Sequence, residues 1–243
     1  RGFYGVPVLR DVTLDVAEGS FTGLIGPNGA GKSTLFNVVS GLYPAESGHI
    51  RFAGQDQTRT PTDARVRAGL VRSFQLARGF PKLTVFQHLM LHGPDQPGDA
   101  LWPALTGAAA VRDHEASLAD DALGVARRLR LDHVLDNPVT ALSGGQKKLL
   151  EIGRALMARP KMILLDEPMA GVNPTLAGEI GDHLTAINRE GITILLIEHD
   201  MALIRRLCDP VIVMAEGTVL TQGPFEEIAA SVAVQEAYLG RRH

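Results

Sequence analysis

A glycine-rich octapeptide near the N-terminus combines the residue types that bind the phosphates of a nucleotide. Residues 26–33 read Gly-Pro-Asn-Gly-Ala-Gly-Lys-Ser and fit the pattern G-x-x-x-x-G-K-[ST] of the P-loop. Glycines let consecutive backbone N–H groups converge on an anion at a helix start. Lys32 would place its charge on the β- and γ-phosphates, and the Ser33 hydroxyl could bind Mg²⁺. An incidental glycine-rich turn would not require all eight residues between a strand and a helix. The predicted nucleotide contacts are Gly26, Pro27, Asn28, Gly29, Ala30, Gly31, Lys32, Ser33 and Thr34.

An acidic pair, Asp166-Glu167, follows the aliphatic run Met162–Leu165. A strand that ends in a carboxylate places it at the carboxyl edge of a sheet, where α/β folds bind their ligands. We expect Asp166 to hold Mg²⁺, directly or through water. Glu167 could then polarise the attacking water as a general base. Such a pair alone is often only a solvated loop start, but the upstream P-loop favours the catalytic interpretation.

A second possible anion site is Leu142-Ser143-Gly144-Gly145-Gln146, which precedes an amphipathic helical pattern. Ser143 can cap that helix, and Gly144 and Gly145 leave its amides open to an anion. An ordinary helix cap would explain the serine but neither glycine. The chain therefore carries two helix N-termini suited to phosphate but only one P-loop.

The hydrophobic pattern indicates the elements that position these residues. Near-continuous apolar runs are typical of parallel strands covered on both faces, and they occur at Phe21–Ile25, Met162–Leu165 and Thr193–Ile197. Val12, Leu14 and Val16 alternate with polar residues, as in a half-buried strand. Val211–Ala215 and Thr218–Thr221 flank a turn and predict a hairpin.

The middle of the chain has a different pattern. Gly and Pro punctuate Gly93–Pro103, and helical spacing resumes from Val111 to Leu131. We predict a helical lobe, residues 76–140, inserted into an ATP-binding core of residues 1–75 and 141–243. The tail from Phe225 to Tyr238 predicts a surface helix. The predicted fold class is α/β: a P-loop NTPase core with a mostly parallel sheet, a small antiparallel β part at the N-terminus and the helical lobe.

Composition limits the possible functions. The 243 residues are 45% hydrophobic and 21% charged with a net charge of -3, so no overall basic field attracts nucleic acid. Cys208 is the only cysteine, which excludes an internal disulfide and a cysteine-based metal cluster and fits a reducing compartment. No apolar run reaches the roughly 18–20 residues needed to cross a bilayer, and no signal peptide is recognisable. We expect any membrane-spanning part of the system to be another polypeptide.

The sequence resembles ATP-binding (nucleotide-binding) subunits of ABC transporters, because Leu142–Gln146 matches the signature of that family. The resemblance implies ATP and Mg²⁺ as cofactors and assigns three further residues. Tyr4 would stack on adenine, although Phe3 is a neighbouring competitor and either ring could be a core residue. Gln75 would touch Mg²⁺ and the water, although a lone glutamine is usually a surface residue. His199 would be the switch histidine at the γ-phosphate, although a lone histidine is more often structural.

The sequence departs from the family pattern at two places. The family usually has a leucine-aspartate element after the catalytic pair, whereas this chain has Gly171-Val172-Asn173-Pro174. Asn173 keeps the hydrogen-bonding shape of aspartate but loses its charge. In addition, few residues precede Tyr4 to form the first strand of the family.

Within the family, the sequence is most similar to the motors of branched-chain (hydrophobic) amino acid importers. Four segments carry this similarity: Ser73–Leu76, Gly171–Pro174, Glu198–Met201 and Glu236–Gly240. The resemblance implies an ATPase on the cytoplasmic side of the cell membrane, peripheral to permease subunits and served by an extracytoplasmic solute-binding protein. The alternatives are a lipid or drug exporter, a soluble ABC ATPase and a regulatory cassette that does not hydrolyse ATP.

The resemblance also implies a head-to-tail dimer, with an identical subunit or a paralogue. Each ATP would lie between Gly26–Thr34 of one subunit and Ser143–Gly145 of the other. A docking surface for the permease is expected on Leu76–His92. Within it, Arg78, Phe80 and Lys82 are assigned to the surface groove, whereas helical spacing places Val85, Phe86, Leu89 and Met90 in the core of the lobe.

Overall fold

The computed structural model describes residues 2–3, 6–73, 80–94 and 109–239. The chain forms two compact units: residues 1–72 together with 161–243, and residues 73–160. We call these the core unit and the helical unit.

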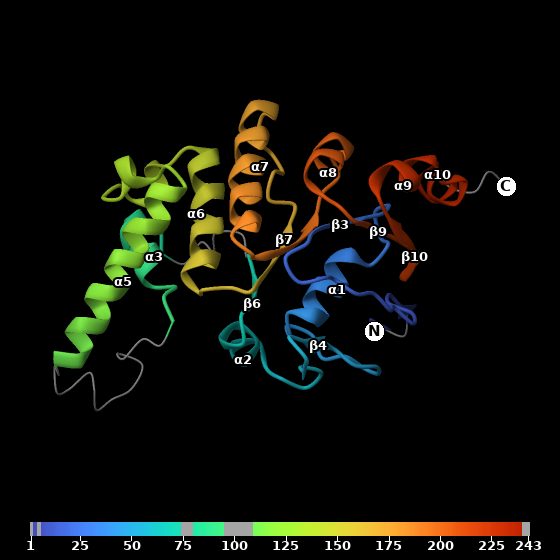
Figure 1. The fold of residues 1–243 in the computed structure, drawn as a ribbon, viewed down its shortest axis with the longest axis horizontal. Coiled ribbons are helices and arrows are strands. Elements are labelled where there is room, and N and C mark those ends of the chain that lie inside the picture. Colours follow the sequence, from blue (N-terminus) through green and yellow to red (C-terminus); the bar gives the residue numbers. More distant parts are fainter. Residues whose placement is uncertain (1, 4–5, 74–79, 95–108, 240–243) are drawn as a thin grey trace. The chain divides into compact units, whose positions relative to one another are not determined.

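The core unit is built on a six-stranded sheet in the order β10-β9-β3-β8-β7-β6 (Figure 1). Its strands are β3 (Phe21–Ile25), β6 (Leu70–Arg72), β7 (Met162–Asp166), β8 (Thr193–Ile197), β9 (Val211–Ala215) and β10 (Thr218–Gly223). All neighbours pair in parallel except β9 and β10, which form an antiparallel hairpin. The four aliphatic strands β3, β7, β8 and β9 are buried because helices cover both faces of the sheet.

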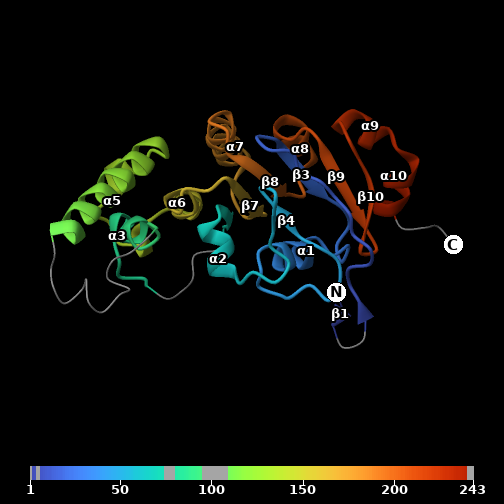
Figure 2. The same ribbon diagram turned by 60° about the horizontal axis from the view of Figure 1, so that its bottom comes forward.

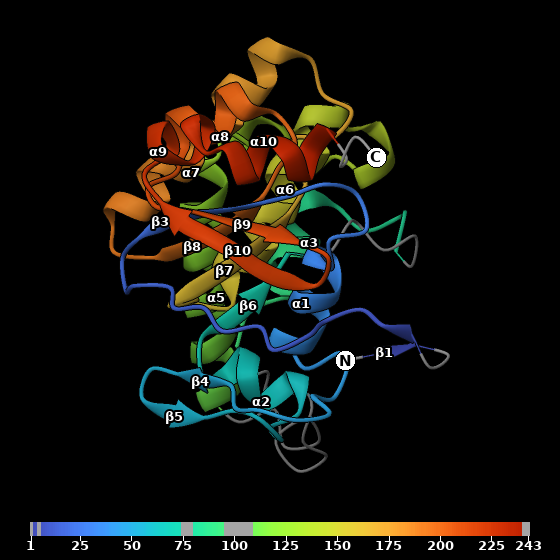
Figure 3. The ribbon, with the colours of Figure 1, turned by 90° about the vertical axis from the view of Figure 1, so that its right-hand side faces the viewer.

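Helices lie on opposite faces of this sheet (Figure 3). One face carries α1 (Lys32–Val39), and the other carries α7 (Pro174–Arg189) and α8 (Met201–Leu207). The remaining elements are short pieces around the sheet. They are β1 (Gly2–Phe3), β2 (Val6–Pro7), β4 (Arg51–Phe52), β5 (Gln55–Asp56), α2 (Thr62–Arg67), α9 (Phe225–Ala230) and α10 (Val232–Leu239).

The helical unit contains α3 (Val85–Met90), α5 (Ala109–Arg128) and α6 (Gly144–Met157), with 3₁₀ turns η2 (Asp132–Val134) and η3 (Val139–Ala141). The three α-helices pack against one another (Figure 2). Gly153 on α6 allows this approach, since an added Cβ would lie 3.0 Å from Leu89 and 3.1 Å from Leu129. The unit is longer than the predicted lobe of residues 76–140, because α6 packs on α3 and α5.

The α/β fold class, the parallel strands and the hairpin are confirmed, and antiparallel pairs β1–β2 and β4–β5 form the small β part. Two local predictions were wrong. Residues 12–16 alternate between half-buried and exposed as expected, yet no strand of the described residues pairs with them. The tail forms two helices instead of one, because Ser231 between them has an extended backbone with ψ 119°.

A buried arginine holds the end of α1 in place. The Arg65 side chain is 2% exposed and donates to four carbonyls, two of them, Val38 and Val39, in the last turn of α1. Burial lowers the pKa of its guanidinium. The four carbonyls compensate for the lost hydration, and those of Val38 and Val39 also lie at the negative end of the helix dipole.

We therefore expect Arg65→Met to lower the free energy of unfolding by about 3 kcal/mol, because it leaves several buried carbonyls unsatisfied. Urea denaturation would measure the change. Arg67→Met is the matched control on the exposed face of the same helix, where the ion pair with Asp63 lies in solvent and contributes little. Equal denaturation midpoints for the two variants would contradict the role assigned to Arg65.

Candidate active site

The P-loop connects β3 to α1, and steric requirements fix its two outer glycines. A Cβ on Gly26 would lie 2.0 Å from the carbonyl oxygen of Met214, and one on Gly31 would lie 2.9 Å from Leu9. Gly29 has φ 82° but nothing within 4 Å of its added Cβ. Glycine at position 29 is therefore required by the left-handed backbone conformation and not by a close neighbour.

The Lys32 side chain, 7% exposed, folds back over the loop. Its Nζ donates to the carbonyl oxygens of Gly26 at 2.7 Å and Pro27 at 3.1 Å. Burial lowers the pKa of the ammonium group, whereas the charges of Glu167 and Asp166 raise it. The structure thus brings Lys32 and the acidic pair within electrostatic range of one another.

Asp166 and Glu167 lie at the carboxyl end of β7. The Oδ2 of Asp166 accepts from Nη2 of Arg72 at 2.9 Å. Glu167 adopts a left-handed backbone, φ 51°, which costs a non-glycine residue about 1–2 kcal/mol. The N–H of Glu167 donates to the carbonyl of Ile197 at 2.9 Å, so the strained residue is held against the end of β8.

Glu167 of the acidic pair is in direct contact with the predicted switch histidine, His199. Nε2 of His199 lies 2.8 Å from Oε1 of Glu167. A carboxylate oxygen only accepts, so Nε2 carries the proton. Both side chains are partly exposed, which leaves them accessible to water and to a phosphate. This arrangement is suited to orienting a general base.

Glu198 is a site residue to which the sequence assigned no role of its own. It is 5% exposed and accepts from the backbone N–H of Met169 at 2.8 Å and of His199 at 3.3 Å. It therefore joins the loop after Glu167 to the segment that carries His199. Burial raises the pKa of its carboxyl, the two N–H donors lower it, and the charge of Glu167 raises it. The sequence signal that could have identified Glu198 is its position between the aliphatic strand Thr193–Ile197 and His199.

Asn173 has a structural task at the point where the sequence departs from the family pattern. It is the N-cap of α7, and its Oδ1 accepts from the N–H of Leu176 at 2.9 Å. Pro174 follows at the first helical position, where proline is favoured. An amide caps a helix about as well as a carboxylate does.

The signature segment lies in the helical unit and begins α6. Ser143 and Gln146 form a reciprocal capping box, with Gln146 N–H donating to Ser143 Oγ at 3.2 Å and Ser143 N–H donating to Gln146 Oε1 at 2.9 Å. The predicted cap is confirmed. Gly144 is exposed with nothing within 4 Å of an added Cβ, so an anion could approach the amides at this helix end. Tyr4 and Gln75 lie outside the described residues.

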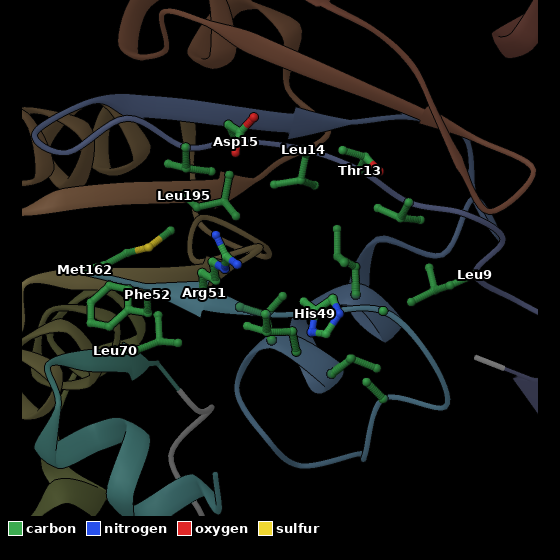
Figure 4. Close-up of a pocket in the computed structure, with 18 of the residues that line it drawn as sticks. Leu9, Thr13, Leu14, Asp15, His49, Arg51, Phe52, Leu70, Met162 and Leu195 are labelled. Carbon is green, nitrogen blue, oxygen red and sulfur yellow. The ribbon is translucent and has the colours of Figure 1, made fainter. Parts of the chain in front are cut away.

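A hollow of about 1150 Å³ lies elsewhere in the core unit (Figure 4). Leu14 and Thr13 lie on one side of it, and Phe52 and His49 lie on the other. None of the P-loop residues, Asp166, Glu167 or His199 lines it. It is therefore separate from the phosphate site and borders the unpaired segment 12–16.

Residues 9–170 match a family model described as ABC transporter. A probable branched-chain amino acid transport ATP-binding protein, LivG of Archaeoglobus fulgidus, is 37% identical over 98% of this chain and 91% of its own length. The corresponding high-affinity protein of Escherichia coli is 34% identical over 98% and 94%. A solved nucleotide-free ATP-binding cassette from an ABC transporter has a TM-score of 0.86 at 35% identity, over 99% of this chain and 96% of that one. The ADP conformation of another such cassette has a TM-score of 0.81 at 34% identity, over 96% and 93%.

The chain therefore belongs to the ABC transporter family. Its place in that family is the ATP-binding subunit, an ATPase that binds adenine nucleotide. Of the helices that the structure describes, none is both long and apolar enough to cross a bilayer.

The raised pKa of Glu198 predicts a pH dependence. A carboxyl with a raised pKa binds its proton more tightly in the folded state, so its ionisation reduces stability as pH rises above the ordinary value of 4.5. Glu198→Gln removes this ionisation. We therefore expect the difference in unfolding free energy, Glu198→Gln minus wild type, to increase as the pH rises above the ordinary value of 4.5.

Denaturation at a series of pH values measures this difference, with the exposed Glu226→Gln as the control. A difference between Glu198→Gln and wild type that stays constant with pH would rule out the proposed ionisation.

Proposed function

We propose that this subunit hydrolyses Mg-ATP to power the import of branched-chain or other hydrophobic amino acids. The proposed solute is supported by similarity to branched-chain amino acid transport proteins over nearly the whole chain. The proposed reaction is supported by the contact between Glu167 and His199 and by the proximity of Glu167 to Lys32 of the P-loop.

The residues present fit a magnesium ion that is shared with a nucleotide. No three His, Cys, Asp or Glu side chains of the described residues are grouped to hold a metal by themselves. Mg²⁺ at phosphates commonly takes only one or two protein ligands and completes its shell with water and phosphate oxygens. Ser33 and Asp166 would hold the ion, together with Gln75. When bound, Mg²⁺ would neutralise the negative charge that develops on the phosphate oxygens during phosphoryl transfer.

The remaining steps are assigned to side chains of this subunit. Lys32 would exchange its loop carbonyls for phosphate oxygens, which are stronger acceptors for an ammonium group. Glu167 would accept a proton from the attacking water, and His199 would hold that carboxylate in place through Nε2. The amides of Ser143–Gly145 from a second subunit would stabilise the γ-phosphate from its other side. ATP would then hold a head-to-tail dimer closed in a way that ADP cannot.

Phe80 supports the proposed docking surface for a membrane permease. Its side chain is 56% exposed, and Lys82 beside it is exposed as well. The buried His88 on α3 donates from Nε2 to the carbonyl of Phe80 at 3.1 Å, which fixes the backbone that presents the ring. Of the four residues expected in the core of the lobe, Val85 and Leu89 are fully buried, whereas Phe86 and Met90 are half-buried.

Glu167→Gln tests the general base. The amide keeps the shape and still accepts from His199, but it cannot take a proton. We expect nucleotide affinity to be retained while ATP hydrolysis falls about 10²–10⁴-fold, together with an ATP-dependent dimer on gel filtration. Glu179→Gln, on the exposed surface of α7, is the control. Hydrolysis near the wild-type rate in Glu167→Gln would refute the assignment.

The complex purified from native membranes through a tag on this chain tests the transported solute. We expect permease subunits to co-purify, and leucine with its binding protein to stimulate hydrolysis in liposomes. Phe80→Asp should abolish this assembly while nucleotide binding by the isolated subunit stays intact, whereas Val232→Asp, at another exposed apolar residue, should not. Stimulation by lipids or drugs and not by amino acids would replace the import proposal with export.

A further inference from the structure

Arg72 joins the two halves of the phosphate site. It is the last residue of β6 and is aligned with Leu164 of β7. Its side chain is only 10% exposed. Nη1 donates to Oδ1 of Asn37 on α1, and Nη2 donates to Oδ2 of Asp166 at 2.9 Å. The guanidinium carbon lies 5.7 Å from the centre of the Phe36 ring, also on α1.

These contacts bear on both elements that supply the proposed magnesium ligands. Ser33 lies in the first turn of α1, and Asp166 ends β7. The planar guanidinium has a fixed fork of donors, so the distance between its two acceptors is constrained. Because Nη2 occupies Oδ2, the orientation of the Asp166 carboxylate is set. Its Oδ1 accepts no hydrogen bond from the part of the chain that the structure describes.

We propose that Arg72 is a positioning residue for magnesium: it holds Asp166 through Oδ2 and leaves Oδ1 as the oxygen available to the ion. The inference rests on the proposed role of Asp166 as a magnesium ligand. Residues that orient a metal ligand typically contribute 10–100-fold to metal affinity.

An opposing effect of Arg72 is repulsion between its positive charge and the ion. The Asp166 carboxylate would interact with both the Arg72 guanidinium and the magnesium ion, and its negative charge would weaken the repulsion between them. The phosphates of ATP add further negative charge to the site. Loss of orientation, by contrast, removes a ligand from its place. Two substitutions separate the effects: Arg72→Gln removes the charge and the fork, whereas Arg72→Lys keeps the charge and removes the fork.

The experiment measures the affinity of Mn²⁺, as a spectroscopic substitute for Mg²⁺, for the full chain saturated with ADP by electron paramagnetic resonance. It also measures binding of a fluorescent ADP analogue in the presence of EDTA. We expect both variants to lose about 10–100-fold in metal affinity while their metal-free ADP affinity stays the same. Arg205→Gln, which breaks an exposed ion pair with Glu226, should change neither quantity.

Three results would overturn the proposal. Unchanged or tighter metal binding in Arg72→Gln would show that charge repulsion dominates. Wild-type metal binding in Arg72→Lys would show that the fork is unnecessary. Equal losses with metal and with EDTA, accompanied by a lower melting temperature, would show a structural role only. Asp166→Asn distinguishes a failure of the underlying assignment: if it binds Mn²⁺ normally, Asp166 is not a ligand, whatever Arg72 does.

Discussion

Parallel hydrogen bonding between β3, β8 and β7 places three functional strand ends at one edge of a buried sheet. The P-loop follows β3, Asp166 ends β7 with Glu167 directly after it, and Glu198-His199 follows β8. In the ladder Asp166 is aligned with Ile197, so a shift of one residue between these two strands would separate Glu167 from His199. The register between β7 and β8 therefore also fixes the geometry of the contact between Glu167 and His199.

Charged groups at this edge each have a partner within the core unit. Lys32 donates to loop carbonyls, Arg72 to Asp166, and His199 to Glu167. Buried or half-buried charges are tolerated because these partners compensate for lost hydration. A nucleotide would replace the loop carbonyls as the acceptors for Lys32, whereas Asp166 and Glu167 would keep the partners that orient them. Most of the polar contacts of the site are therefore in place before a nucleotide binds.

Features that depend on a local sequence pattern were predicted from the sequence. Features that depend on which surfaces pack together in the folded chain were not. The P-loop, the buried strands and the cap at Ser143 each have a signal within a few residues, and all three are present in the structure. The packing of α6 with the helical unit was missed because an amphipathic stripe does not identify the surface that covers it. Arg72 and Glu198 were missed as partners because a single charge has no spacing to interpret. The alternation at 12–16 predicted burial correctly, but pairing requires a neighbouring strand.

The left-handed backbone of Glu167 sets stability against activity at one position. Glycine would adopt φ 51° without the steric cost that a side chain pays, so selection for stability alone would favour glycine there. A glycine has no carboxylate, however, and a chain that carried it would lose the base proposed above. With glutamate in that proposed role, the position would trade stability for activity. Drift toward glycine at the corresponding position in a related chain would indicate that hydrolysis there had ceased to matter.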